Sequence, residues 1–182
     1  MNKASSRCLV IDADIVCAAS DSNCPDPTPR CCRAFLSSVF NICHRVALTP
    51  EIREEWDRHK SRVGVQWRAS MSDHEKIVLL ESLEVNQALR DAIQDLRINQ
   101  EERDVMLKDC HLLEAALATD RIVVSRDGTA RGLFARHAES LPGIADVVWV
   151  DPVKSAEEVA SWLKNGALSE ERYKLRNYQP HK

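Results

Sequence analysis

The sequence predicts an α/β protein with three layers, in which helices cover both faces of a central, mainly parallel sheet. Short apolar segments without alternating polar residues recur along the chain, and such segments suit strands that are buried on both faces. Helical patterns separate them, and strands that alternate with helices form a parallel sheet through crossover connections. Four strands are expected, at residues 7–12, 45–48, 121–124 and 146–150.

The composition is typical of one soluble globular domain. The 182 residues are 44% hydrophobic and 29% charged, with a formal net charge of -3. The longest apolar runs are far shorter than the roughly 20 residues of a membrane span, and the polar N-terminus lacks a secretory cleavage site. The seven cysteines are an odd number, which argues against a disulfide framework. We therefore expect a cytoplasmic protein with reduced thiols and no membrane contact.

The first part of the chain is predicted to alternate strands with helices. After the first strand, three prolines predict a surface loop over 21–30. Apolar residues at helical spacing predict a helix over 31–44, which leads into the second strand. Thr49 followed by Pro50 is a typical N-cap and first-turn pair, so a further helix should run from Pro50 to about Lys60.

The middle of the chain, residues 72–117, is predicted to be mostly helical. Ser72 with Glu75, and Asn99 with Glu102, each place a capping residue three positions ahead of an acid, a pattern that marks a helix start. An amphipathic stripe lies between the two pairs and indicates a helix that packs on one face.

The last part of the chain is predicted to contain two strands and a closing helix. Leu141, Pro142 and Gly143 form the turn between the strands. The closing helix is expected over 153–163, ended by Asn165 and Gly166. Residues 166–182 are expected to be a charged C-terminal tail.

Acidic residues follow three of the predicted strands. In an open parallel sheet, the ligand site lies beyond the carboxyl ends of the strands. Asp12 and Asp14 follow the first strand, Asp127 follows the third, and Asp109 lies on a predicted helix near buried leucines. The second strand is followed by three acids: Glu51, Glu54 and Glu55.

A divalent cation would explain why these acids gather at one edge of the sheet. Carboxylates that lie close together repel one another and raise their own pKa values unless a cation lies among them. Oxygen ligands with few His or Cys residues favour Mg²⁺ or Mn²⁺. Each acid also has a simpler explanation, since Asp is a common N-cap and acids are frequent in a first helical turn. The hypothesis therefore depends on the position that the acids share.

Four segments of the chain resemble the four sequence blocks of the PIN-domain family and occur in the same order. They are LVIDAD at 9–14, LTPEIREEW at 48–56, DCHLLEAAL at 109–117 and IVVSRD at 122–127. The resemblance covers most of residues 7–150. It implies a metal-dependent nuclease, similar in fold to flap endonucleases, with a PIN-like domain over 1–165 and a helical insertion at about 72–98.

The resemblance also implies roles for single residues. The implied catalytic acids are Asp12, Glu55, Asp109 and Asp127. Asp12, Asp109 and Asp127 would hold Mg²⁺ or Mn²⁺, and Glu55 would complete the pocket and help orient the attacking water. Ser125 occupies the hydroxyl position, from which it could hold a carboxylate or a metal-bound water. The chain departs from the family at Asp14, where Asn is usual, and Asp14 would add either a metal ligand or an outer-shell acceptor for water. It also departs at Glu114, where a small residue is common; five positions after Asp109, Glu114 points to a different face of the helix, and it is a supporting candidate for the site.

Basic residues should flank an acidic pocket that binds a phosphate chain, because the acids alone repel it. Arg126 and Arg131 are the predicted substrate-binding residues, since they lie close to Asp127 in the sequence. His111 follows Asp109 by two positions, but its place among Leu and Ala residues indicates a packed, hydrogen-bonded side chain rather than a general base.

The leading hypothesis is a divalent-metal-dependent endoribonuclease that hydrolyses RNA phosphodiester bonds, either the toxin of a toxin–antitoxin pair or an RNA-processing enzyme. Its expected partner is RNA, either single-stranded or structured. An antitoxin protein and a second copy of the chain are further candidate partners. An alternative is a catalytically weak PIN-like domain that binds RNA or protein. A phosphatase or receiver-like domain is a third hypothesis, because Asp12 and Asp14 follow a strand, but no later strand ends with the Lys that this chemistry needs.

Overall fold

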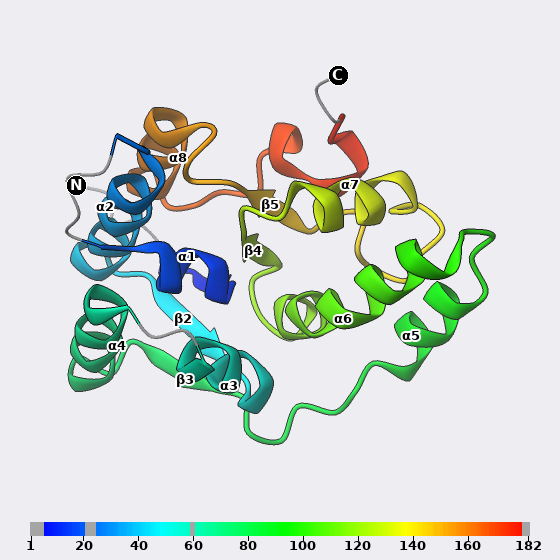
Figure 1. Cartoon of the computed structure of the whole chain (residues 1–182), viewed down its shortest axis with the longest axis horizontal. Helices are drawn as coiled ribbons and strands as arrows, with labels where there is room; N and C mark the ends of the chain where they lie inside the picture. The colour runs from blue at the N-terminus through cyan, green and yellow to red at the C-terminus, as the bar shows by residue number, and fades with distance from the viewer. Residues whose placement is uncertain (1–5, 21–24, 59–60, 180–182) are drawn as a thin grey trace.

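The computed structural model describes residues 6–20, 25–58 and 61–179. Within these residues, five strands form a single parallel sheet in the order β3-β2-β1-β4-β5 (Figure 1). The strands are β1 (Cys8–Ile11), β2 (Arg45–Leu48), β3 (Ile77–Leu79), β4 (Ile122–Val124) and β5 (Val148–Val150). In the central strand β1, Val10 pairs with Ala47 on one side and Val123 on the other. The predicted α/β class with a parallel sheet is confirmed.

Helices form a layer on each side of the sheet (Figure 1). One layer contains α1 (Ala13–Ala18), α2 (Thr28–Asn41), α4 (Arg62–Asp73) and α8 (Ala156–Lys164). The other contains α5 (Gln87–Gln94), α6 (Gln100–Leu117) and α7 (Gly128–Arg136), while α3 (Pro50–Arg58) contacts both α1 and α6. None of the helices in the described ranges combines the length and apolar character that crossing a membrane requires.

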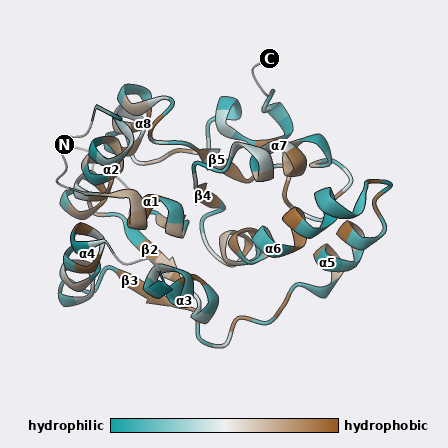
Figure 2. Ribbon diagram, viewed as in Figure 1, coloured by the Kyte–Doolittle hydropathy of each residue, from teal (hydrophilic) through white to brown (hydrophobic). Residues whose placement is uncertain are grey.

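The core lies between the sheet and the two helical layers. Every residue of β1, β4 and β5 is buried, which explains why these strands contain no charged residue. Figure 2 shows hydrophobic residues along the strands and hydrophilic residues on the outer sides of the helices. Trp56 and Trp67 add large buried rings, and their indole N–H groups donate to the carbonyls of Ile11 (3.1 Å) and Leu36 (2.7 Å). The six cysteines of the described residues are free thiols, and Cys24 lies outside those residues.

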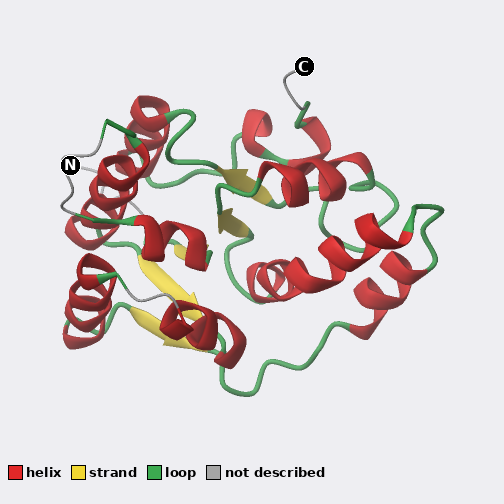
Figure 3. Ribbon diagram, viewed as in Figure 1, coloured by secondary structure: helices red, strands yellow, loops and turns green. Residues whose placement is uncertain are grey.

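The edge strand β3 was not predicted from the sequence. The Ser72 and Glu75 pair does not start a helix, because Ser72 lies in the last turn of α4 and Glu75 reverses the backbone with a φ of 56°. The chain then enters β3, whose three residues are too few and too exposed to produce a strong pattern. A long loop over 80–86 leads to the opposite layer (Figure 3), where the side chain of Asn86 caps α5.

Two predicted helix starts are confirmed by their hydrogen bonds. The hydroxyl of Thr49 accepts a hydrogen bond from the N–H of Ile52 at 3.2 Å, at the start of α3. The side chain of Asn99 accepts one from the N–H of Glu102 at 2.8 Å, at the start of α6. These caps satisfy backbone donors that have no partner inside the helix.

Two other helices begin at positions different from those predicted. Helix α2 begins at Thr28, within the predicted proline loop, because Pro29 falls in the first turn, where a missing N–H costs no helical hydrogen bond. The first part of that loop, residues 21–24, lies outside the described residues. Helix α8 begins at Ala156 rather than at 153, because the N–H of Val153 donates to the side chain of Asp151 in a turn that precedes the helix.

The described part of the segment 166–182 packs back onto β5. It is charged, as predicted, and it contains two short turns, η1 (Glu171–Tyr173) and η2 (Leu175–Asn177). Leu175 is fully buried, and its N–H donates to the carbonyl of Val147 at 2.9 Å. An antiparallel bridge joins Lys174 to Val148. The helix before this segment ends as predicted, with Gly166 at a φ of 95°.

Candidate acidic site at the carboxyl edge of the sheet

A cavity of about 270 Å³ opens where β1 and β4 end. Five carboxylates line it, together with Arg58 and Lys108, and we call it the acidic cavity. The carboxylates are those of Asp12, Asp14, Glu55, Asp109 and Asp127. They come from four segments of the chain: the junction of β1 and α1, helix α3, helix α6 and the junction of β4 and α7. The four acids of the PIN-like blocks therefore lie around one cavity.

Asp12 and Asp127 each cap a helix at the cavity. Oδ1 of Asp12 accepts a hydrogen bond from the N–H of Asp14 at 3.4 Å, at the start of α1. Oδ1 of Asp127 accepts one from the N–H of Ala130 at 2.8 Å, at the start of α7. Both residues are therefore N-caps, as the simpler explanation requires, and both also line the cavity. The two roles are compatible because capping uses only one oxygen of each carboxylate.

Ser125 connects the two capping acids. Its hydroxyl donates to Oδ2 of Asp12 at 2.7 Å and accepts from the N–H of Asp127 at 3.0 Å. The side chain is buried, with 1% of the residue exposed. Ser125 therefore orients the carboxylate of Asp12, which is one of the two roles expected of a hydroxyl at this position.

Asp14 and Arg126 are joined across the same edge. Oδ2 of Asp14 accepts from the backbone N–H of Arg126 at 2.9 Å, and the guanidinium of Arg126 donates to the carbonyl of Asp14 at 3.3 Å. Oδ1 of Asp14 is buried and has no hydrogen-bond partner among the described residues. Burial and the nearby charge of Asp12 raise the pKa of Asp14 to about 7.

Burial also raises the pKa values of Asp12 and Asp109. The hydrogen bond from Ser125 opposes this effect at Asp12, but the pKa remains above its ordinary value. The pKa of Asp109 is raised to about 6, although the positive charge of Lys108 acts in the opposite direction. Burial therefore disfavours the ionised forms of these acids, and a bound cation would stabilise those forms.

Glu55 is the exception, because it is paired with His111. Nε2 of the histidine lies 3.2 Å from Oε2 of Glu55, and its Nδ1 donates to the carbonyl of Lys108 at 2.9 Å. The hydrogen bond with His111 lowers the pKa of Glu55. Burial opposes a charge on His111, but the interaction with Glu55 outweighs it and raises the histidine pKa. His111 is therefore packed and hydrogen-bonded, as expected, and it holds Glu55 in the ionised form.

The acids do not form a preassembled metal site. Across the residues that the structure describes, no group of three or more His, Cys, Asp or Glu side chains is placed to hold a metal ion. The donors that line the acidic cavity are nevertheless carboxylate oxygens, the ligands that Mg²⁺ and Mn²⁺ prefer. The unpartnered Oδ1 of Asp14 is the atom most in need of such a partner.

Glu114 and Arg131 lie away from the acidic cavity. Glu114 faces another side of α6, where both of its carboxylate oxygens pair with Arg90 at 2.8 Å, and Oε1 also accepts from the N–H of Asn86. Arg131 lines a different cavity, beside α7. In contrast, Lys108 lines the acidic cavity and was not singled out from the sequence, although its position next to Asp109 was a signal that could have identified it.

The pair of Glu114 and Arg90 should contribute to stability in a pH-dependent way. Burial opposes ionisation of Glu114, but the hydrogen bonds from Arg90 and Asn86 outweigh it and lower the pKa below its ordinary value of 4.5. A lowered native pKa stabilises the fold above the unfolded-state pKa, and the stabilisation is lost as the pH falls through the native pKa. Glu114→Gln should therefore lower the free energy of unfolding at neutral pH by about 1–2 kcal/mol.

Urea unfolding at neutral pH and at a pH well below 4.5 checks this prediction. The difference between the wild type and Glu114→Gln should shrink in acid, because Glu114 itself becomes protonated. Glu84→Gln is the control, since Glu84 is exposed in the loop over 80–86. A difference that stays the same at both pH values would show that the charge of Glu114 contributes nothing.

Comparisons with protein-family models, with curated proteins and with solved structures found no match for the chain. The chemistry of the acidic cavity and the fold that positions it are therefore the basis on which a function can be proposed.

Proposed function

We propose that the protein is a divalent-metal-dependent endoribonuclease that hydrolyses RNA phosphodiester bonds at the acidic cavity. The observation that carries this proposal is the placement of five carboxylates, from four segments of the chain, around one cavity at the carboxyl edge of a parallel sheet. The resemblance of four segments to the PIN-domain blocks supports it, since the acids of all four blocks line this cavity.

The acidic cavity fits Mg²⁺ or Mn²⁺ in the chemistry of its donors. Asp12, Asp109 and Asp127 are the residues that would hold the ion. Burial raises the pKa values of Asp12 and Asp109, and a bound cation would stabilise their ionised forms. When bound, such an ion makes a water molecule more acidic and neutralises charge on the leaving oxygen.

The other residues of the cavity would position the reactants. Glu55 is held ionised by His111, so it can accept a hydrogen bond from the attacking water and orient it. Ser125 fixes the orientation of Asp12. Lys108 and Arg58 place positive charge at the cavity, which reduces the repulsion between the acids and an RNA phosphate.

A second candidate function is a catalytically weak PIN-like domain that binds RNA or protein. The lack of a preassembled metal-ligand group in the described residues favours this candidate. Under either proposal the protein would act in the cytoplasm, with RNA as a partner and with an antitoxin protein or a second copy of the chain as a further one.

Metal dependence separates the two candidates. Purified protein is incubated with a mixed pool of single-stranded RNA in the presence of Mg²⁺, Mn²⁺ or EDTA, and Mn²⁺ binding is measured in parallel. The nuclease should cut RNA with either metal and lose all activity in EDTA. A folded protein that binds no Mn²⁺ and cuts no RNA would overturn the catalytic proposal in favour of the binding module.

A further inference from the structure

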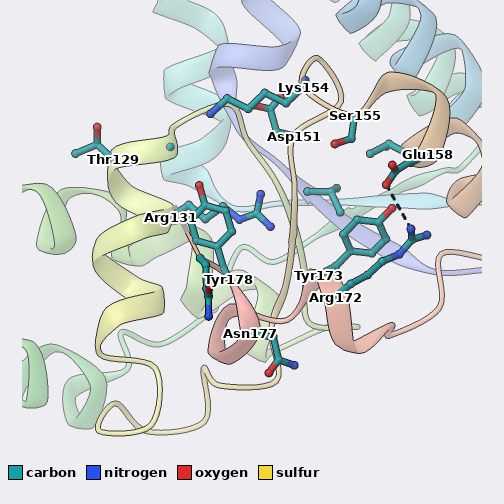
Figure 4. Close-up of a pocket in the computed structure, with 14 residues that line it drawn as sticks. Thr129, Arg131, Asp151, Lys154, Ser155, Glu158, Arg172, Tyr173, Asn177 and Tyr178 are labelled. Carbon is teal, nitrogen blue, oxygen red and sulfur yellow. Dashed lines mark hydrogen bonds and ion pairs between the residues drawn. The ribbon is translucent and has the colours of Figure 1, made fainter. Parts of the chain in front are cut away.

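A second and larger cavity, of about 770 Å³, lies beside helix α7. Its walls come from the start of α7, the connection between β5 and α8, and the turns η1 and η2 (Figure 4). We call it the Tyr–Arg cavity, after its defining residues Arg131, Lys154, Arg172, Tyr173 and Tyr178. Its volume lies within the roughly 300–1,000 Å³ typical of small-ligand sites, which is enough for one nucleotide.

The Tyr–Arg cavity adjoins the acidic cavity along the sheet edge. Asp127 lines the acidic cavity, and the next two residues, Gly128 and Thr129, line the Tyr–Arg cavity. Asp151, which directly follows β5, lines it from the other side. Because β4 and β5 are parallel neighbours, their carboxyl ends meet at the same edge. The two cavities therefore lie at the same edge of the sheet.

Two cations of the Tyr–Arg cavity have no acidic partner. In the described ranges of the chain, neither Arg131 nor Lys154 forms an ion pair. Nε of Arg131 is buried without a hydrogen-bond partner among those residues, as is the hydroxyl of Tyr173. The negative charge of Asp151 acts on Arg131 without forming an ion pair with it. A half-buried guanidinium that is not ion-paired favours the binding of an anion such as a phosphate.

The acidic groups of the cavity have partners of their own. Glu158 pairs with Arg172 at 3.3 Å, at one side of the cavity (Figure 4). Oδ1 of Asp151 accepts hydrogen bonds from the N–H groups of Val153 and Lys154. Asp151 leaves a carboxylate oxygen that can accept from a ribose hydroxyl or a base N–H. Arg172 also pairs with Glu170 at 2.8 Å. Besides Arg172 and Glu158, the charged residues that line the cavity are two cations, Arg131 and Lys154, and one anion, Asp151.

The walls also offer flat surfaces for a base. The guanidinium of Arg131 lies 3.9 Å from the ring centre of the half-buried Tyr178. The guanidinium of Arg172 lies 4.6 Å from the ring centre of Tyr173, which is buried and also contacts Trp162. The surfaces open to a base are therefore the ring of Tyr178 and the exposed guanidinium of Arg172. Unpaired bases stack both on aromatic rings and on guanidinium planes. An inorganic anion would use the cations alone, whereas a nucleotide would use the cations and these surfaces together.

We propose that the Tyr–Arg cavity binds one nucleotide of a single-stranded RNA. Lys154 and Arg131 bind the phosphate, and the ring of Tyr178 and the guanidinium of Arg172 stack on the base. The inference rests on the proposed function for the choice of RNA as the strand, but binding at this cavity needs neither metal nor cleavage.

The test measures RNA binding without catalysis. A labelled single-stranded RNA oligonucleotide is titrated with the full chain in EDTA, and its fluorescence anisotropy is followed at several salt concentrations. Lys154→Ala should raise the Kd about five-fold and reduce the dependence of log K on log salt by about one unit, as expected for a lost phosphate contact. Lys154 is exposed, so this variant should fold normally.

Two further variants identify the source of the binding. Tyr178→Ala should raise the Kd about five-fold or more, because a stacking surface is lost. Lys164→Ala is the matched control: Lys164 is an exposed lysine at the end of α8, outside the cavity, and its removal should leave the Kd unchanged. Wild-type affinity in both Lys154→Ala and Tyr178→Ala would overturn the proposal, and so would an equal loss of affinity in Lys164→Ala.

A free ribonucleoside monophosphate distinguishes a strand site from a site for small nucleotides. If the monophosphate binds in a Lys154-dependent manner but RNA does not, the proposal is overturned. The failure of the proposed function looks different: Lys154-dependent RNA binding without cleavage in Mg²⁺ or Mn²⁺ would leave this inference standing and remove the nuclease. Metal-dependent cleavage, combined with RNA binding that is unchanged in Lys154→Ala and Tyr178→Ala, would support the nuclease and overturn this inference.

Discussion

Asp127→Asn is expected to reduce metal-dependent RNA cleavage at least about 100-fold, because the variant removes one of the charges that would hold the metal ion, a contribution of several kcal/mol. Asparagine has the same shape and is an equally good N-cap, so its side-chain oxygen can still accept the hydrogen bond from the N–H of Ala130. The fold of α7 should therefore be preserved. Initial cleavage rates in Mn²⁺, with circular dichroism as a check of folding, test this expectation.

Asp104→Asn is the matched control for this variant. Asp104 is exposed on α6, the helix that carries Asp109, and its side chain accepts a hydrogen bond from Gln100 at 2.7 Å. Its replacement should leave the cleavage rate unchanged. If Asp127→Asn retained a rate within about ten-fold of the wild type, the effect would be far below that of a lost metal ligand, and Asp127 would have no direct role.

Gly64→Val is expected to lower the free energy of unfolding by about 3 kcal/mol, the largest stability effect we anticipate. Gly64 lies in α4, where a Cβ atom would meet the backbone carbonyl oxygen of Val16 at 2.6 Å and a methyl carbon of the same residue at 2.8 Å. Valine gains only a few tenths of a kcal/mol over glycine in helix propensity, so the clash decides the sign. Helix α4 would have to move away from α1, which carries Asp14.

Urea unfolding of Gly64→Val and of a neighbouring control checks this second prediction. Val65 is 50% exposed on the same helix, so Val65→Ala should change the free energy of unfolding by less than about 0.5 kcal/mol. A Gly64→Val protein as stable as the wild type would show that α4 and α1 can separate at no cost.

The fold class could be predicted because most strands are buried on both faces. Burial on both faces leaves an unbroken apolar run such as CLVI in β1, which is easy to identify in a sequence. Strand β3 has no such pattern, since it lies at the edge of the sheet and its three residues are partly exposed. Ser72 and Glu75 match the pattern of a capping residue followed by an acid, which predicts a helix start. In the structure they instead form a turn after α4, in which the N–H of Glu75 donates to the carbonyl of Ser72.

The part of the acidic cavity that could be predicted is the part that the order of the parallel strands positions. Parallel strands bring Asp12 and Asp127 to one edge whatever the helices do. The orientation of a helix is decided by packing, which the sequence does not state. Glu114 lies five positions after Asp109 and so points to another face of α6, where it pairs with Arg90. The pairing of Glu55 with His111 joins two helices that are 56 positions apart, and no local pattern signals it.

The packing of the C-terminal segment on β5 also affects how this protein meets other chains. An outer strand of a sheet exposes unpaired backbone groups, and a flat apolar strand such as VWV is then a template for aggregation. Here the backbone of Lys174 and Leu175 occupies that side of β5, and the ammonium group of Lys174 pairs with Asp146 and Glu171. The C-terminal segment therefore shields this side of β5 from pairing with a strand of another chain.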